Sequence, residues 1–86
     1  MESKYLIFDK QIVVGRKTPI FVIYSKSDEM PLGRITFWPA WRKYVFEPMD
    51  STIFDAACLT DILAMLNEAT TEWRNSLKEK ANESKR

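Results

Sequence analysis

The sequence predicts an α+β fold in which an antiparallel β-meander of about four strands packs on one long C-terminal helix. Three observations predict it. The first half of the chain alternates runs of β-branched and aromatic residues with Gly, Pro and Ser turn signals. After Pro48 the apolar residues recur at helical spacing instead. The order of four strands followed by a helix favours a two-layer domain, with the helix on one face of the sheet.

Short turn segments separate the four expected strands. Residues 4–14 (KYLIFDKQIVV) form the first strand. Residues 20–26 (IFVIYSK) form the second, and their consecutive apolar residues are typical of a strand covered on both faces. Residues 32–38 (LGRITFW) and 41–47 (WRKYVFE) form a hairpin around the Pro39-Ala40 break.

The helix is expected to begin between Ile53 and Ala56. Two start signals overlap there, because Thr52 with Asp55 fits a capping box and Asp55 alone fits an N-cap. We expect the helix to fray after Leu77, where apolar residues end.

Composition indicates one folded domain. The chain has 86 residues, of which 45% are hydrophobic and 29% charged, within the range of globular proteins. We expect a single domain of residues 1–80 and a charged, disordered tail of residues 81–86. No apolar run reaches the roughly 18 residues that cross a bilayer, and the first ten residues do not resemble a secretory signal. A cytoplasmic protein without membrane contact is expected.

Two scarce residue types narrow the chemistry. The chain has no histidine and one cysteine, Cys58, so an internal disulfide, a zinc site and a His-dependent catalytic triad are not expected. Its two glycines, Gly15 and Gly33, do not form a phosphate-binding loop. We therefore predict a protein that is not an enzyme and has no catalytic residue, metal or cofactor. Cys58 is interpreted as a packing residue.

Acidic residues near the strand-to-helix junction offer one enzymatic alternative. Such carboxylates could hold Mg²⁺ or act as an acid and base pair. The same residues also suit turns, an N-cap and the first turns of a helix, which is the favoured interpretation. They are Glu47, Asp50, Asp55 and Asp61.

The hairpin predicts a surface that carries aromatic and basic side chains. If Pro39-Ala40 is the connection, Trp38 lies opposite Trp41 and the remaining pairs follow by counting outward. Ile35, Phe37, Tyr44 and Phe46 then face the helix, together with Gly33 and Arg42. The candidate binding residues on the other face are Arg34, Trp38, Trp41 and Lys43.

Three interpretations of that surface stay open. The tryptophans could only stabilise the hairpin. Alternatively, nucleic acid could bind, since bases stack on exposed indoles while Arg and Lys neutralise phosphates. Residues 10–46 hold seven basic and two acidic residues, which favours this second interpretation. The overall net charge of +1, however, is low for a nucleic-acid module.

The third interpretation is a protein partner. Ile20, Val22 and Tyr24 alternate with Phe21 and Ile23, so apolar side chains should remain on the sheet face that the helix does not cover. A patch of that kind usually has a partner. This predicts a protein–protein interaction module, either a homodimer or a phage-encoded inhibitor of a host complex.

The stretches PLGRITFWPAWRKYVFEP and TIFDAACLTDILAML resemble a small family of uncharacterised bacterial and bacteriophage proteins. Residues 32–66 carry the resemblance, under half of the chain. It implies the fold boundaries and a bacterial or phage origin, and no activity. The topology is also similar, in outline only, to the DNA-binding domains of phage-type integrases, which combine a three-stranded sheet with a helix.

Overall fold

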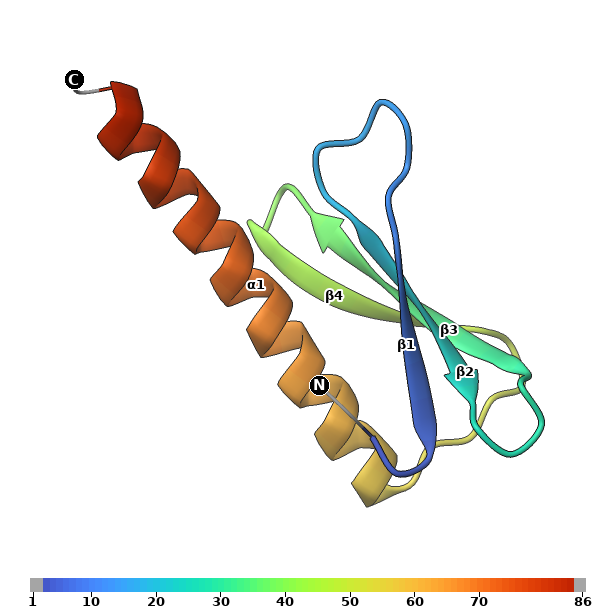
Figure 1. Cartoon of the computed structure of the whole chain (residues 1–86). Helices are drawn as coiled ribbons and strands as arrows, with labels where there is room; N and C mark the ends of the chain where they lie inside the picture. Colours follow the sequence, from blue (N-terminus) through green and yellow to red (C-terminus); the bar gives the residue numbers. More distant parts are fainter. Residues whose placement is uncertain (1–2, 85–86) are drawn as a thin grey trace.

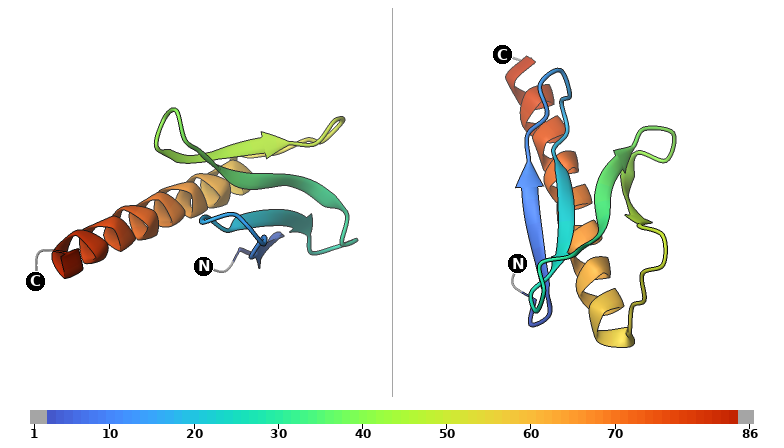
Figure 2. Two further views of the ribbon diagram at one scale, coloured as in Figure 1. Left: turned by 90° about the horizontal axis from the view of Figure 1, so that it is seen from above. Right: turned by 90° about the vertical axis from the view of Figure 1, so that its right-hand side faces the viewer.

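Four antiparallel strands and one long helix make up the described part of the chain. The computed structural model describes the backbone of residues 3–84 and the side chains of residues 3–78. The strands form one sheet in the order β1-β2-β3-β4, and the helix lies against one of its faces (Figure 1, Figure 2). The predicted α+β fold is confirmed. The elements are β1 (Leu6–Gln11), β2 (Ile20–Ser25), β3 (Pro31–Trp38), β4 (Lys43–Pro48) and α1 (Ala56–Ser84).

The first strand is shorter than the predicted strand of residues 4–14. Gln11 pairs with Ile20, the first residue of β2, so the chain after Gln11 has no neighbouring strand. Ile12 and Val14 are consequently exposed rather than part of the sheet. Gly15 has a φ angle of 87°, and glycine adopts this conformation without steric cost. The connection between β1 and β2 is therefore a long loop that includes two exposed apolar residues.

Asp55 begins the helix as an N-cap. Its carboxylate accepts a hydrogen bond of 2.9 Å from the backbone N–H of Cys58, which satisfies one of the free amide groups of the first turn. The Thr52 hydroxyl instead donates to the Met49 carbonyl oxygen, at 2.7 Å. Of the two start signals in the sequence, the structure therefore uses Asp55 alone.

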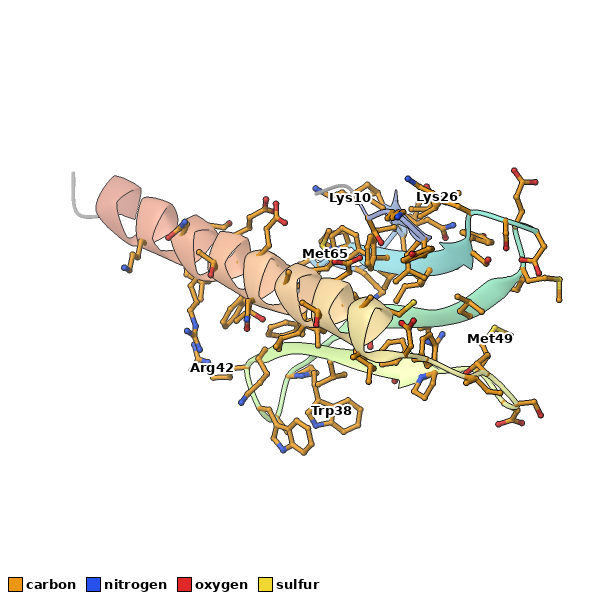
Figure 3. The ribbon with its side chains drawn as sticks, turned by 90° about the horizontal axis from the view of Figure 1, so that it is seen from below. Lys10, Lys26, Trp38, Arg42, Met49 and Met65 are labelled. Atoms are coloured by element: carbon orange, nitrogen blue, oxygen red, sulfur yellow. The ribbon has the colours of Figure 1, made fainter. Side chains whose placement is uncertain are left out.

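The core lies between the helix and one face of the sheet. From the helix, Met65 points at the sheet (Figure 3), and Ile23 and Ile35 beneath it are fully buried. Aromatic rings close the core at one side, where Phe37 meets Tyr44 edge-on. The buried apolar residues are Leu6, Phe21, Ile23, Ile35, Tyr44, Ile62, Met65 and Ala69.

The helix is longer than the sheet that it covers. Its 29 residues span about 43 Å, whereas a strand of six residues spans about 20 Å. The C-terminal part of α1 therefore projects past the sheet (Figure 1). Its backbone stays helical to Ser84, well past the predicted fraying point at Leu77. The disordered tail of residues 81–86 stays a prediction, and residues 85 and 86 lie outside the described residues.

Ser3 ties the start of the chain to the helix. Its buried hydroxyl donates to the carboxylate of Asp61 at 2.5 Å and accepts from the backbone N–H of Leu6 at 3.2 Å. Asp61 thus holds the N-terminal segment against α1. Within the described residues, no helix is both long enough and apolar enough to cross a membrane.

Candidate binding surface at one end of the sheet

The β3–β4 register differs by two residues from the predicted one. Trp38 pairs with Lys43 rather than lying opposite Trp41. The reason is a turn of four residues, 39–42, in which Arg42 has a φ angle of 55° and its N–H bonds to the Trp38 carbonyl oxygen at 2.9 Å. Because side chains alternate with a period of two, a shift of two residues leaves the paired residues of β3 and β4 on their predicted faces, whereas Trp41 and Arg42 lie in the turn. The predicted faces of the two strands are therefore correct, although the predicted register is wrong.

Trp38 and Trp41 form an exposed aromatic pair away from the helix. Trp38 lies at the end of β3, on the face that α1 does not cover, hereafter the helix-free face (Figure 3). Trp41 lies in the turn, not in a strand. Their ring centroids are 5.9 Å apart, with the planes tilted by 55°. The side chains are 44% and 63% exposed, so both indoles can contact a ligand.

Arg34 lies on the helix-free face but is not a free cation. Its Nε donates to the Glu47 carboxylate at 2.5 Å, directly across β3 and β4. The same row of the sheet continues through Val22 to Asp9. Acidic groups therefore balance Arg34 in the middle of the helix-free face. The predicted pairing of Arg34 with Val45 is wrong, because in the observed register Glu47 lies opposite Arg34.

Basic side chains gather instead at one end of the sheet. In an antiparallel meander, alternate connections lie at the same end, and Figure 1 shows the β1–β2 loop and the β3–β4 turn together there, beside the C-terminal half of α1. The ring of Trp73 on the helix lies 4.6 Å from Phe37 and 5.7 Å from the Arg42 guanidinium. Glu72 is an acidic residue among them. We call the following residues the basic end: Arg16, Lys17, Arg42, Lys43, Arg74 and Lys78.

The opposite end of the molecule has the opposite charge. It contains the β2–β3 turn and the connection from β4 to α1, which carry Asp28 and Glu29, and Asp50 and Asp55, respectively. Two basic residues, Lys4 and Lys26, lie at the same end, where the Lys26 amide donates to the Tyr5 carbonyl oxygen. Although the net charge is only +1, basic and acidic side chains are therefore concentrated at opposite ends of the molecule. Sequence reasoning missed this arrangement, because Arg74 and Lys78 join the basic end only through the fold.

Ile20, Val22 and Tyr24 lie on the helix-free face, as the sequence predicts. Each is partly buried by its neighbours. Tyr24 pairs with Ile7 of β1, which is 37% exposed and lies on the same face. This face thus combines partly buried apolar residues with the Arg34–Glu47 ion pair, without the strong positive charge of the basic end.

Three of the four junction carboxylates have structural partners. Glu47 binds Arg34, Asp55 caps α1 and Asp61 binds Ser3. Among the side chains that the structure describes, no three or more acidic or cysteine groups are placed to hold a metal ion. The hydrogen bond from the Cys58 amide holds the pKa of Asp55 below its ordinary value.

No family model, curated protein or solved structure matches this chain. The resemblance of residues 32–66 to bacterial and bacteriophage proteins therefore stays a prediction.

Proposed function

We propose that this protein is a non-enzymatic binding protein that contacts single-stranded nucleic acid at its basic end, through Trp38 and Trp41. One observation carries the proposal. Trp38 of the exposed indole pair lies opposite Lys43 on the neighbouring strand, and Arg42 directly follows Trp41 in the chain. Stacking faces and phosphate-neutralising groups thus occur within one turn and the strand that follows it.

The tilt of the two indoles favours unpaired bases. At 55° the rings do not form a parallel slot, so each offers its own face to a base. A stacked base contributes about 1–3 kcal/mol, with little preference for sequence. In a duplex the base faces are covered by neighbouring bases, whereas in a single strand they are free to stack on a protein.

The remaining cations extend the surface in two directions. Arg16 and Lys17 lie on the β1–β2 loop, and Arg74 and Lys78 lie on the helix. Each Lys or Arg that neutralises a phosphate releases counterions, so binding weakens as salt rises. This arrangement suits a nucleic-acid backbone that passes across the end of the sheet.

The experiment is a binding titration of a labelled single strand of about 12 nucleotides by fluorescence anisotropy. We expect affinity to fall steeply with salt. Trp41→Ala should weaken binding about 5- to 150-fold, the equivalent of one lost stack. Ile53→Ala is the matched control, because Ile53 is 92% exposed and lies on the β4–α1 connection. Binding that is absent at low salt, or equally weakened by both variants, would contradict the proposal.

A protein partner at the helix-free face is the second candidate. It is favoured by the partly exposed row of Ile20, Val22 and Tyr24 and by the neutralisation of Arg34 by Glu47. The partner would be a second copy or a host complex that the protein inhibits. Association through an apolar face should persist at moderate salt, which separates this candidate from nucleic-acid binding. Tyr24→Ala should weaken it and leave nucleic-acid binding unchanged.

A further inference from the structure

A groove lies between the helix and β4, the edge strand that runs beside it (Figure 1). Its volume is about 420 Å³, within the range of pockets that hold small organic ligands. Most of the side chains that line the groove are exposed, so it is open to solvent. They include Lys43 from the strand and Leu63, Leu66, Asn67, Thr71 and Arg74 from the helix.

The floor of the groove is occupied by the chain's own fold. The Tyr44 amide donates to the Thr70 hydroxyl at 3.0 Å, and Leu66 packs partly against the core. The contact between Tyr44 and Thr70 joins the two walls, so they do not move independently. The side chains that remain for a ligand are those of the rim, such as Leu63 and Asn67, which are exposed.

The charge of the groove is positive. Lys43 and Arg74 line it, and among the side chains that the structure describes no carboxylate does. Between residues 56 and 78 the carboxylates of the helix lie on its other flank: Glu68 and Glu72 line a cavity beside β1, and Asp61 holds the N-terminal segment. A negatively charged ligand therefore meets two cations in this groove without a competing carboxylate.

The groove continues the basic end. Lys43 lies opposite Trp38 in the sheet and also lines the groove, so it links the exposed indole pair to the groove. Along the helix axis, Leu63 lies about 16 Å from Arg74. The groove therefore has its cations at the basic end and its apolar wall farther from that end.

We propose that this groove binds one nucleotide of the single strand that stacks on the exposed indole pair, an inference that rests on the function proposed above. Lys43 and Arg74 hold the phosphate, and the base lies against Leu63 with the Asn67 amide at its edge. Cations bind phosphate oxygens through charge-assisted hydrogen bonds. The apolar wall suits a flat ring, and an amide offers both a donor and an acceptor to the edge of an unpaired base.

The first test compares Leu63→Glu with Ala64→Glu in the anisotropy titration of the labelled single strand. Both variants add one carboxylate at an exposed position of the same helix, but Leu63 lines the groove and Ala64 lies on the side of the helix away from the sheet. We expect Leu63→Glu to weaken binding at least about 10-fold more than Ala64→Glu, because its carboxylate repels the phosphate and displaces the base. Equal weakening by the two variants, or none by either, would overturn the inference.

The second test separates this inference from the proposed function. In an NMR titration with the same strand, the side-chain amide signals of Asn67 should shift together with the indole signals of Trp38 and Trp41. Asn75 is the control, because it is exposed on the outer side of the same helix. Indole signals that shift while those of Asn67 stay unmoved, or move no more than those of Asn75, would overturn the inference and leave the proposed function standing. Unmoved indole signals would overturn both.

Discussion

Arg34 and Glu47 lie directly opposite each other on β3 and β4, and the arginine Nε donates to the carboxylate at 2.5 Å. This contact makes the middle of the helix-free face electrically balanced. A phosphate group that approached Arg34 would have to compete with Glu47. The positive charge available to a nucleic acid is therefore concentrated at the basic end, where Lys43 pairs with Trp38.

Arg34 and Lys43 should differ in their effect on nucleic-acid binding, although both are exposed cations of the hairpin. Lys43→Ala should weaken binding and lower the slope of log affinity against log salt by about 1. Arg34→Ala should change affinity less, and stability by less than about 1 kcal/mol, because the ion pair is solvent-exposed. Anisotropy titrations in a salt series measure both slopes. An equal or greater loss for Arg34→Ala would contradict the role given to Glu47.

Gly33 should not tolerate a side chain. A Cβ atom there would lie 2.7 Å from the Glu47 carbonyl oxygen and 2.8 Å from the Phe46 ring, and the first of these belongs to the backbone of β4. We expect Gly33→Ala to lower the free energy of unfolding by about 1–3 kcal/mol, measured by chemical denaturation. Gly15→Asn is the control and should lower the free energy of unfolding by less. A Cβ atom at Gly15 meets no neighbouring atom, and Asn tolerates a positive φ angle. An equal loss of unfolding free energy in the two variants would contradict the crowding at Gly33.

Thr70 should protect the edge of β4. Thr70→Val keeps the shape of the side chain but removes the acceptor for the Tyr44 amide. We expect a loss of about 0.5–1.5 kcal/mol and faster hydrogen exchange at Tyr44. Thr71→Val is the matched control, since Thr71 is exposed and makes no such contact with the strand. Unchanged exchange at Tyr44 in Thr70→Val would show that the hydroxyl does not hold this amide.

Cys58 should react slowly with thiol reagents. Burial is the main cause that raises the pKa of its thiol, and the neighbouring Asp55 carboxylate raises it further. A raised pKa means less thiolate at any given pH near neutrality, and the thiolate is the reactive form. The rate should therefore rise with pH over a higher range than in the unfolded chain.

Asp55→Asn tests the cause of that slow reaction. Asparagine keeps a capping oxygen but removes the negative charge, so Cys58 should react faster at the same pH. Asp50→Asn, on the connection before the helix, is the control and should leave the rate unchanged. A rate that Asp55→Asn leaves unaltered would assign the slow reaction to burial alone.

The faces of the hairpin could be predicted from the sequence, but its register could not. Alternation assigns Ile35 and Phe46 to the core face in any register that is shifted by two residues. The turn length depends on Arg42 adopting a positive φ angle, which is unusual outside glycine and asparagine. The Pro39-Ala40 break suggested instead a turn of two residues. The prediction therefore placed Trp41 in the strand, whereas it lies in the turn.

The location of positive charge also required the fold. A window of residues 10–46 already indicates a basic region, but it counts Arg34, which Glu47 neutralises. The same window omits Arg74, which is distant in the sequence but belongs to the basic end in the folded chain. Local pattern therefore identified Trp38 as a surface residue, and the antiparallel topology determined which charges lie near it.

The most direct test of the proposed function is an NMR titration of the indole N–H signals of the three tryptophans with a short single-stranded oligonucleotide at low salt. We expect the signals of Trp38 and Trp41 to shift together and to return as salt is added, while the amide signals of Asp28 and Glu29 do not move. Unmoved indole signals, or shifts confined to the amides of Ile20, Val22 and Tyr24, would contradict the proposed function.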